Sequence, residues 1–147
     1  MPSSVFVNEQ LGLRISQHTG SVKRSEFDTL VGMYRANPRV FLYDVVHIID
    51  ETAKFDFGVE ELPALKVDLR NLIDDAKLPL ILRSAWICPN PKAWEMLEAW
   101  LHERHSLDGL HTEACLVATL DEVSDVFDRD EIHAVRNMIG FRPFFSI

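Results

Sequence analysis

Three side chains on one expected helix have the spacing of metal ligands. Glu98, His102 and His105 stand at positions i, i+4 and i+7, which places them on one helical face. Imidazole and carboxylate groups are common zinc ligands, but the sequence offers no evident fourth ligand. Histidines at the C-terminal end of a helix are also stabilised by the helix dipole without any metal. We therefore expect neither a metal site nor a cofactor.

Two candidates for acid–base chemistry lie on a second element, the apolar run from Val40 to Asp50. Asp50, which Glu51 follows, falls where this run ends, and open α/β sheets place their sites at the carboxyl ends of strands. The same pair is also typical of a simple turn after a strand. His47 is either a base or a packed histidine. An enzyme that uses Asp50 or His47 is a third hypothesis, behind the two developed below.

The motifs of nucleophilic and phosphate chemistry are missing from the sequence. It has no Gly-x-Ser-x-Gly elbow and no glycine-rich phosphate loop. Neither Cys88 nor Cys115 belongs to a CxxC pattern, and both lie in apolar stretches that favour free, packed thiols. We therefore predict a protein that is not an enzyme and has no catalytic residues.

Charge excludes several partners. The chain carries 15 Lys and Arg residues against 23 Asp and Glu residues, a net charge of -8. Nucleic acids and anionic membranes require clustered basic residues, so we expect neither as a partner. The sequence also lacks the pattern of a signal peptide and of a transmembrane helix, which predicts a cytoplasmic protein. The acidic stretch 121–131 is either a solvated face or a docking site for a basic partner.

Alternating strand and helix patterns position these residues. The strands, which are rich in apolar and β-branched residues, are expected at 4–7, 13–19, 40–50, 80–88 and 111–117. The helices, which repeat apolar residues at helical spacing, are expected between 25 and 37, 62 and 73, 90 and 101, 119 and 127, and 130 and 139. The expected boundaries include N-caps at Ser25, Asn90 and Thr119 and a C′ glycine at Gly140.

This order of elements predicts an α/β fold. Strands that helices separate need crossover connections, so the central sheet should be mixed, mostly parallel, and flanked by helices, with about four or five strands. We expect residues 1–128 to form this domain. Residues 129–147 add a C-terminal helical extension and an aromatic tail, which belong to the same domain or to a dimer contact.

Exposed aromatic side chains suggest a contact surface. The tail carries Phe141, Phe144 and Phe145, and it either folds back on its own domain or is buried in a homodimer. Met96 and Trp100, on the helix that begins after Asn90, are the second candidate for a dimer contact.

Three strand sequences carry a family resemblance. The strand from Leu13 ends in Gly20, the next strand ends in Ile48-Ile49-Asp50, and a later strand reads Arg83-Ser84-Ala85-Trp86-Ile87. With the order of elements, these patterns resemble the STAS-like domains, in particular the small bacterial SpoIIAA-like proteins. The resemblance covers roughly residues 3–128. It implies the STAS fold and a regulatory role through protein contacts.

The sequence departs from this family at the regulatory serine. The resemblance implies an Asp-Ser-Ser-Gly motif whose serine is phosphorylated to control release of a partner. The nearest match here is Asp56-Phe57-Gly58, and phenylalanine cannot be phosphorylated. We therefore predict that the serine phosphorylation switch is absent.

Two hypotheses about function follow. The first is a non-catalytic regulatory or protein-interaction module, whose contact surface includes the loop and helix start at 56–63. The second is a small-molecule or lipid-binding domain, since STAS-like folds also resemble Sec14-type lipid carriers. An exposed apolar patch at Phe55 and Phe57 would favour the first, and an enclosed pocket at the carboxyl ends of the strands would favour the second. The candidate binding residues are Asp50, Thr52, Phe55, Asp56, Phe57, Trp86 and Trp94.

Overall fold

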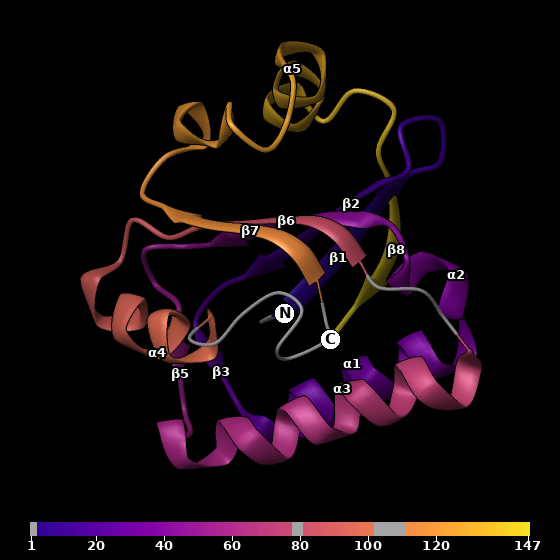
Figure 1. Ribbon diagram of the computed structural model, residues 1–147. Coiled ribbons are helices and arrows are strands. Elements are labelled where there is room, and N and C mark those ends of the chain that lie inside the picture. Colours follow the sequence, from indigo (N-terminus) through magenta and orange to yellow (C-terminus); the bar gives the residue numbers. More distant parts are fainter. Residues whose placement is uncertain (1–2, 78–80, 102–110) are drawn as a thin grey trace.

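A single six-stranded sheet organises the chain. The computed structural model describes residues 3–77, 81–101 and 111–147, with the backbone alone at 81–82 and 111–112. The strands of the sheet are β1 (Ser3–Asn8), β2 (Leu13–His18), β4 (Asp44–Ile49), β6 (Ile81–Ile87), β7 (His111–Val117) and β8 (Arg142–Ser146). Their order is β7-β6-β4-β2-β1-β8 (Figure 1). The strands β2, β4, β6 and β7 are parallel, and β1 is antiparallel to β2 and β8.

The α/β class with a mostly parallel mixed sheet is therefore confirmed, but the expected number of strands was too low. The additional strand is β8, which the sequence treated only as an aromatic tail. A second, two-stranded parallel sheet pairs β3 (Ser21–Val22) with β5 (Lys54–Phe55) beside the main one.

The helices divide between the two faces of the sheet. α1 (Arg24–Ala36), α3 (Leu62–Ala76) and α4 (Pro91–Leu101) lie on one side, and α5 (Arg129–Asn137) lies on the other with the short 3-10 helix η3 (Leu120–Val123) (Figure 1). From β2 to β7 each new parallel strand joins the same edge. Right-handed crossovers then put all the connecting helices on one face. The chain returns across the opposite face and ends at the far edge of the sheet.

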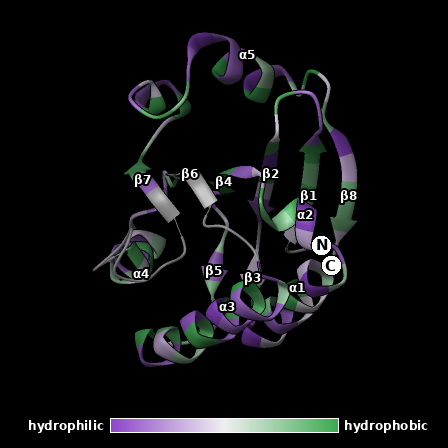
Figure 2. Ribbon diagram, turned by 45° about the vertical axis from the view of Figure 1, so that its right-hand side comes forward, coloured by the Kyte–Doolittle hydropathy of each residue, from purple (hydrophilic) through white to green (hydrophobic). Residues whose placement is uncertain are grey.

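Amphipathic helices cover the first face. Hydrophobic and hydrophilic residues alternate along α1 and α3 in Figure 2, as expected for helices with one side on a core. On α3 the buried residues are Leu62, Leu65, Leu72 and Ile73, at the spacing that the sequence predicted. Among the described residues, no helix is both long and apolar enough to cross a bilayer.

Several predicted boundaries were wrong. The strand expected to begin at Val40 begins at Asp44, because Pro38–Phe41 forms the short helix α2. Pro38 suits the first turn of a helix, because backbone N–H groups at this position have no partner within the helix and the missing N–H of proline costs nothing. The helix α1 has its N-cap at Lys23 and not at Ser25.

The later helices also differ from the prediction. The helix expected between 119 and 127 is reduced to η3, although Thr119 is its N-cap as predicted. α5 ends at Asn137, and Met138, with a φ of 54°, takes the left-handed position predicted for Gly140. The strand β6 begins at Ile81, and its predicted start at Leu80 lies outside the described residues.

The C-terminal tail folds back onto its own sheet. β8 pairs antiparallel with β1, and Ser3 and Ile147 donate backbone hydrogen bonds to each other over N–O distances of 3.4 and 2.9 Å. Phe144 and Phe145 pack against the core below the sheet, and Phe141 packs against the core under α5. The segment 129–147 thus supplies a helix and an edge strand to the main sheet.

Candidate ligand-binding cavity

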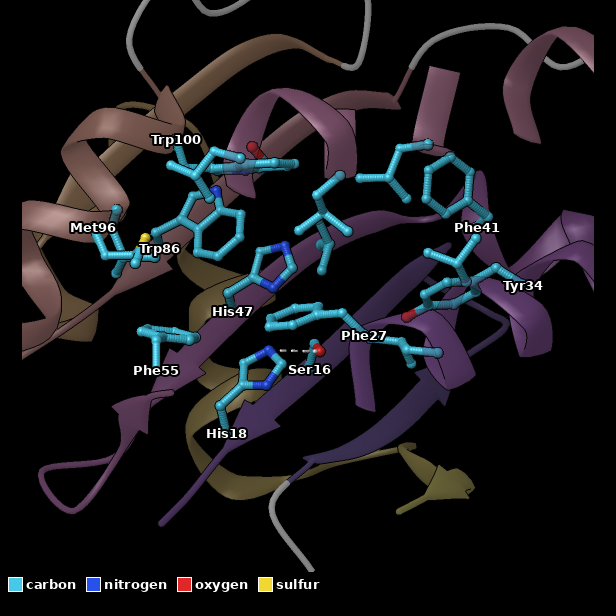
Figure 3. A pocket seen from close by; sticks show the side chains of 18 of the residues that line it. Ser16, His18, Phe27, Tyr34, Phe41, His47, Phe55, Trp86, Met96 and Trp100 are labelled. Atoms are coloured by element: carbon cyan, nitrogen blue, oxygen red, sulfur yellow. Dashed lines mark hydrogen bonds between the residues drawn. The ribbon is translucent and has the colours of Figure 1, made fainter. Parts of the chain in front are cut away.

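A cavity of about 110 Å³ lies between the sheet and the helices α1, α3 and α4 (Figure 3). Its aliphatic lining comes mainly from the helices and includes Leu65, Leu69 and Met96. Its aromatic lining comprises Phe27, Tyr34, Phe41, Phe55, Phe57 and Trp100. Its floor is the sheet, and the floor is where the polar groups lie.

The register of three parallel strands builds this floor in two rows. Arg14 of β2, Val45 of β4 and Ser84 of β6 are partners across the sheet and form the first row. Ser16, His47 and Trp86 form the second row. Because side chains two residues apart on a strand point to the same face, all of these positions face the helices and line the cavity.

Arg14 is a buried cation with unused hydrogen-bond donors. The residue is 2% exposed, and its Nε and Nη1 atoms have no hydrogen-bond partner in the described part of the chain. Its guanidinium carbon lies 4.7 Å from the centroid of the Tyr34 ring and 5.3 Å from that of Phe41. These rings hold the cation in place.

The neighbours of Arg14 do not neutralise its charge. Burial raises the pKa of Tyr34. The charge of Arg14 and a hydrogen bond from Arg14 oppose this shift but do not reverse it, so the phenol is neutral. Among the residues that the structure describes, no carboxylate forms an ion pair with Arg14.

A second arginine shows how this sheet compensates a structural cation. Arg83 lies on the opposite face, where its Nε donates to Asp44 at 2.8 Å and its two Nη atoms donate to both oxygens of Glu131 at 2.8 Å. Arg83 Nη1 also donates to the Val126 carbonyl at 3.2 Å. The hydrogen bond from Arg83 lowers the pKa of Glu131, so this carboxylate is ionised. The network ties α5 to the sheet, and Arg14 has no equivalent.

His18 closes one end of the floor as a neutral group. Its Nδ1 lies 2.9 Å from the Ser3 hydroxyl. Its Nε2 lies 3.3 Å from the Ser16 hydroxyl (Figure 3). Burial lowers the pKa of His18 to about 4, so the imidazole carries no charge at neutral pH. The serines satisfy both ring nitrogens, so His18 makes no demand for a charged partner.

Two further polar atoms of the floor lack a partner. Ser84 is 2% exposed, and in the described residues neither its hydroxyl nor the Trp86 indole N–H has a hydrogen-bond partner. The Trp86 ring stacks on His47 with 3.6 Å between ring centroids. Buried polar atoms normally form hydrogen bonds with protein, water or ligand. These two donors are therefore available to a polar group that enters the cavity.

Some of the predicted binding residues line this cavity. They are Phe55, Phe57 and Trp86, and the two predicted dimer residues Met96 and Trp100 join them there. Trp100 is buried in the core of this chain.

The other predicted binding residues are not among those that line the cavity. Asp50 and Thr52 form a turn after β4, in which the Thr52 N–H donates to Asp50 at 3.0 Å and the Thr52 hydroxyl donates to it as well. These bonds lower the pKa of Asp50. Asp56 is exposed at the end of β5. The Trp94 indole donates to Glu98 at 2.7 Å along α4.

The polar floor is what the sequence prediction missed. Arg14, Ser16 and His18 alternate with Leu13 and Ile15, which is typical of a half-buried strand with one solvated face. The strand lies in the interior of a sheet that is covered on both faces. Strands in the interior of a parallel sheet are normally apolar on both faces. Polar residues at every second position of such a strand were therefore the signal in the sequence that could have indicated a polar site.

The three side chains that have the spacing of metal ligands are only partly described. Glu98 accepts the hydrogen bond of Trp94, and His102 and His105 lie outside the described residues. Over 3–77, 81–101 and 111–147, no cluster of three or more His, Cys, Asp or Glu side chains could hold a metal ion. Cys88 and Cys115 are free thiols, and burial raises the pKa of both.

Comparison with known proteins identifies no relative of this chain: no family model, no curated protein and no solved structure matches it. The resemblance to STAS-like domains stays an expectation from the sequence. The chemistry of the cavity is therefore the basis for a functional proposal.

Proposed function

We propose that this chain is a non-catalytic domain that binds a small molecule between its sheet and the helices α1, α3 and α4. The observation that carries this proposal is an apolar cavity whose floor holds buried polar groups without partners. Ligand sites combine apolar walls with a few convergent polar groups in this way. An ordinary core is packed densely and leaves few buried donors unsatisfied.

The size of the cavity limits the ligand. A dry apolar cavity of roughly 150 Å³ in another protein takes up benzene. A volume of about 110 Å³ therefore suits one ring or a short chain. At about 24 cal/mol per Å³, an empty cavity of this size costs roughly 2–3 kcal/mol of stability. A ligand that fills it recovers that loss, which is a large share of the stability of a small domain.

Two observations support ligand binding over the other hypotheses. Phe55 and Phe57 line the cavity, whereas a protein-contact surface built on them needs their rings on the outside. Asp50 lies on an exposed turn, and hydrogen bonds from Thr52 lower its pKa. A general acid needs the opposite shift and a place in a cleft.

The STAS-like, SpoIIAA-like architecture belongs to the same proposal. Its support is the order of two antiparallel strands followed by three parallel strands with helical crossovers, together with the strand end at Asp50. Phe57 stands where that family carries its phosphorylated serine. In a regulatory module of this kind, occupancy of the cavity takes the place of phosphorylation as the signal.

Native mass spectrometry of the purified protein tests the binding function. We expect an additional mass that is lost on denaturation, or a bound mass after addition of single-ring or short-chain compounds. The variant Leu69→Trp, which fills the cavity from α3, should lose this mass. The matched control is Val67→Trp on the same helix, because Val67 is 57% exposed. Wild-type protein that retains no mass and binds none of the compounds would contradict the proposal.

A further inference from the structure

We infer that the ligand is a small hydrophobic monocarboxylic acid whose carboxylate pairs with Arg14. This inference rests on the proposed binding function and names the chemical class of the ligand. The variants and probes below separate a wrong ligand class from a cavity that binds nothing.

The charge balance of the cavity requires an anion. Arg14 is the charged residue among the described residues that line the cavity. Tyr34 beside it and His18 further along β2 are both neutral at pH 7. A buried charge without a counterion is strongly unfavourable, and one carboxylate at Arg14 removes that penalty.

The donors of Arg14 are arranged in advance for this partner. The rings of Tyr34 and Phe41 lie against the guanidinium and fix its position, while Nε and Nη1 retain unused N–H groups. A carboxylate oxygen accepts such charge-assisted hydrogen bonds more strongly than a neutral oxygen does. The binding group is therefore already built, and little side-chain entropy is lost when the ligand enters.

The charge of the ligand is limited to about one unit. Arg14 is the one arginine or lysine among the described residues of the lining, and the serines of the two rows, Ser16 and Ser84, are uncharged. A phosphate monoester carries close to two negative charges at neutral pH and would leave one of them buried without a partner. A carboxylate matches the single positive charge of Arg14.

The remainder of the ligand must be apolar. From Arg14 the first row crosses Val45 to Ser84, a span of roughly 10 Å for two strand spacings. Aromatic side chains, including Phe27 and Trp100, surround this span. The hydrocarbon part of the acid lies over Val45, and Ser84 at the far end can donate to an additional oxygen where the acid has one.

Calorimetric titration with matched acids and amides tests this assignment. The probes are benzoate and butanoate, each compared with its uncharged amide at pH 7.5. Wild-type protein should bind each acid about 10- to 100-fold more tightly than its amide, as expected for a hydrogen-bonded charge. In the variant Arg14→Met this preference should vanish while amide affinity is retained, which shows that the cavity is intact. The control Arg35→Met removes an exposed arginine from α1 and should bind as the wild type does.

The outcomes distinguish the two proposals. Equal affinity of acid and amide for the wild type overturns the carboxylate assignment and leaves ligand binding standing. An acid preference that survives in Arg14→Met also overturns the role of Arg14. Failure of all four probes to bind the wild type overturns this inference and the binding function together.

Discussion

Replacement by methionine should lower the stability of the protein far more at Arg83 than at Arg14, the other arginine of the sheet. Methionine keeps most of the length of the side chain and removes the charge. In the variant Arg83→Met, Asp44 and Glu131 lose their shared cation although their side chains are only 13% and 9% exposed. Breaking a buried ion pair in this way costs about 3–5 kcal/mol of unfolding free energy, because the remaining charges are buried without a partner.

The variant Arg14→Met should lose little stability in the ligand-free protein. It loses the contacts of the cation with Tyr34 and Phe41, which are worth about 2 kcal/mol where water is excluded. It also removes an uncompensated buried charge, and an apolar replacement of such a charge often gains about 1–4 kcal/mol. These effects nearly cancel. We therefore expect the free energy of unfolding to fall by less than about 2 kcal/mol or to rise.

Urea unfolding of ligand-free protein measures both changes, provided that the m-value is the same in each variant. Arg35→Met is the control, because its exposed ion pair with Asp75 should contribute less than about 1 kcal/mol. A loss in Arg14→Met as large as that in Arg83→Met would refute the reasoning. It would mean that the folded protein already compensates the charge of Arg14.

Three further perturbations test other parts of the structure. Burial lowers the pKa of His18 from 6.5 to about 4, so the folded state binds a proton less readily than the unfolded state. The free energy of unfolding should therefore fall by up to about 1.4 kcal/mol per pH unit as the pH drops from about 6.5 to 4. The variant His18→Gln should flatten this slope in urea unfolding, and an unchanged slope would contradict the assignment. Because Arg83 lowers the pKa of Glu131, this carboxylate contributes stability above about pH 4.5 that is lost as the pH falls further. Glu131→Gln should therefore destabilise the protein more at pH 7 than at pH 3, whereas equal losses at both would argue against the ion pair. Deletion of residues 141–147 removes β8 and leaves one edge of β1 unpaired; size-exclusion chromatography should show association or aggregation, and an unchanged monomer of unchanged stability would count against this pairing.

Local signals in the sequence predicted the elements well where neighbours in the chain decide the conformation. The strands β1 and β2 were predicted from their apolar and β-branched residues, and the start of α4 from Asn90 before a proline. The stretch Val40–Tyr43 was assigned to a strand because β-branched and aromatic residues favour strands. The proline before it and the burial of Phe41 beside Tyr34 favour a helical turn there instead.

Contacts between distant segments could not be read in this way. The tail pairs with β1, which lies at the other end of the described chain, so no local pattern could show that it forms β8. The polar floor was visible in Arg14, Ser16 and His18, but the sequence did not show that the helices cover it. Phe55, Phe57 and Trp86 were predicted because their type suits a ligand site. Their shared cavity depends on how α1, α3 and α4 pack.

The pairing of β8 with β1 has a consequence for how this chain folds. The hairpin of β1 and β2 closes a short loop and can form within microseconds. The contact between Val7 and Arg142 joins residues from opposite ends of the described chain. Contacts between residues so far apart in the sequence form slowly, because a long loop must be closed first. Until they form, the outer edge of β1 is open to pairing with other molecules. The residues that line the cavity all lie between Arg14 and Trp100, on the other side of β1 from β8. Phe144 and Phe145 of β8 nevertheless pack against the core that contains the cavity walls. Closure of this sheet edge therefore completes that core and also determines how long the chain is exposed to aggregation.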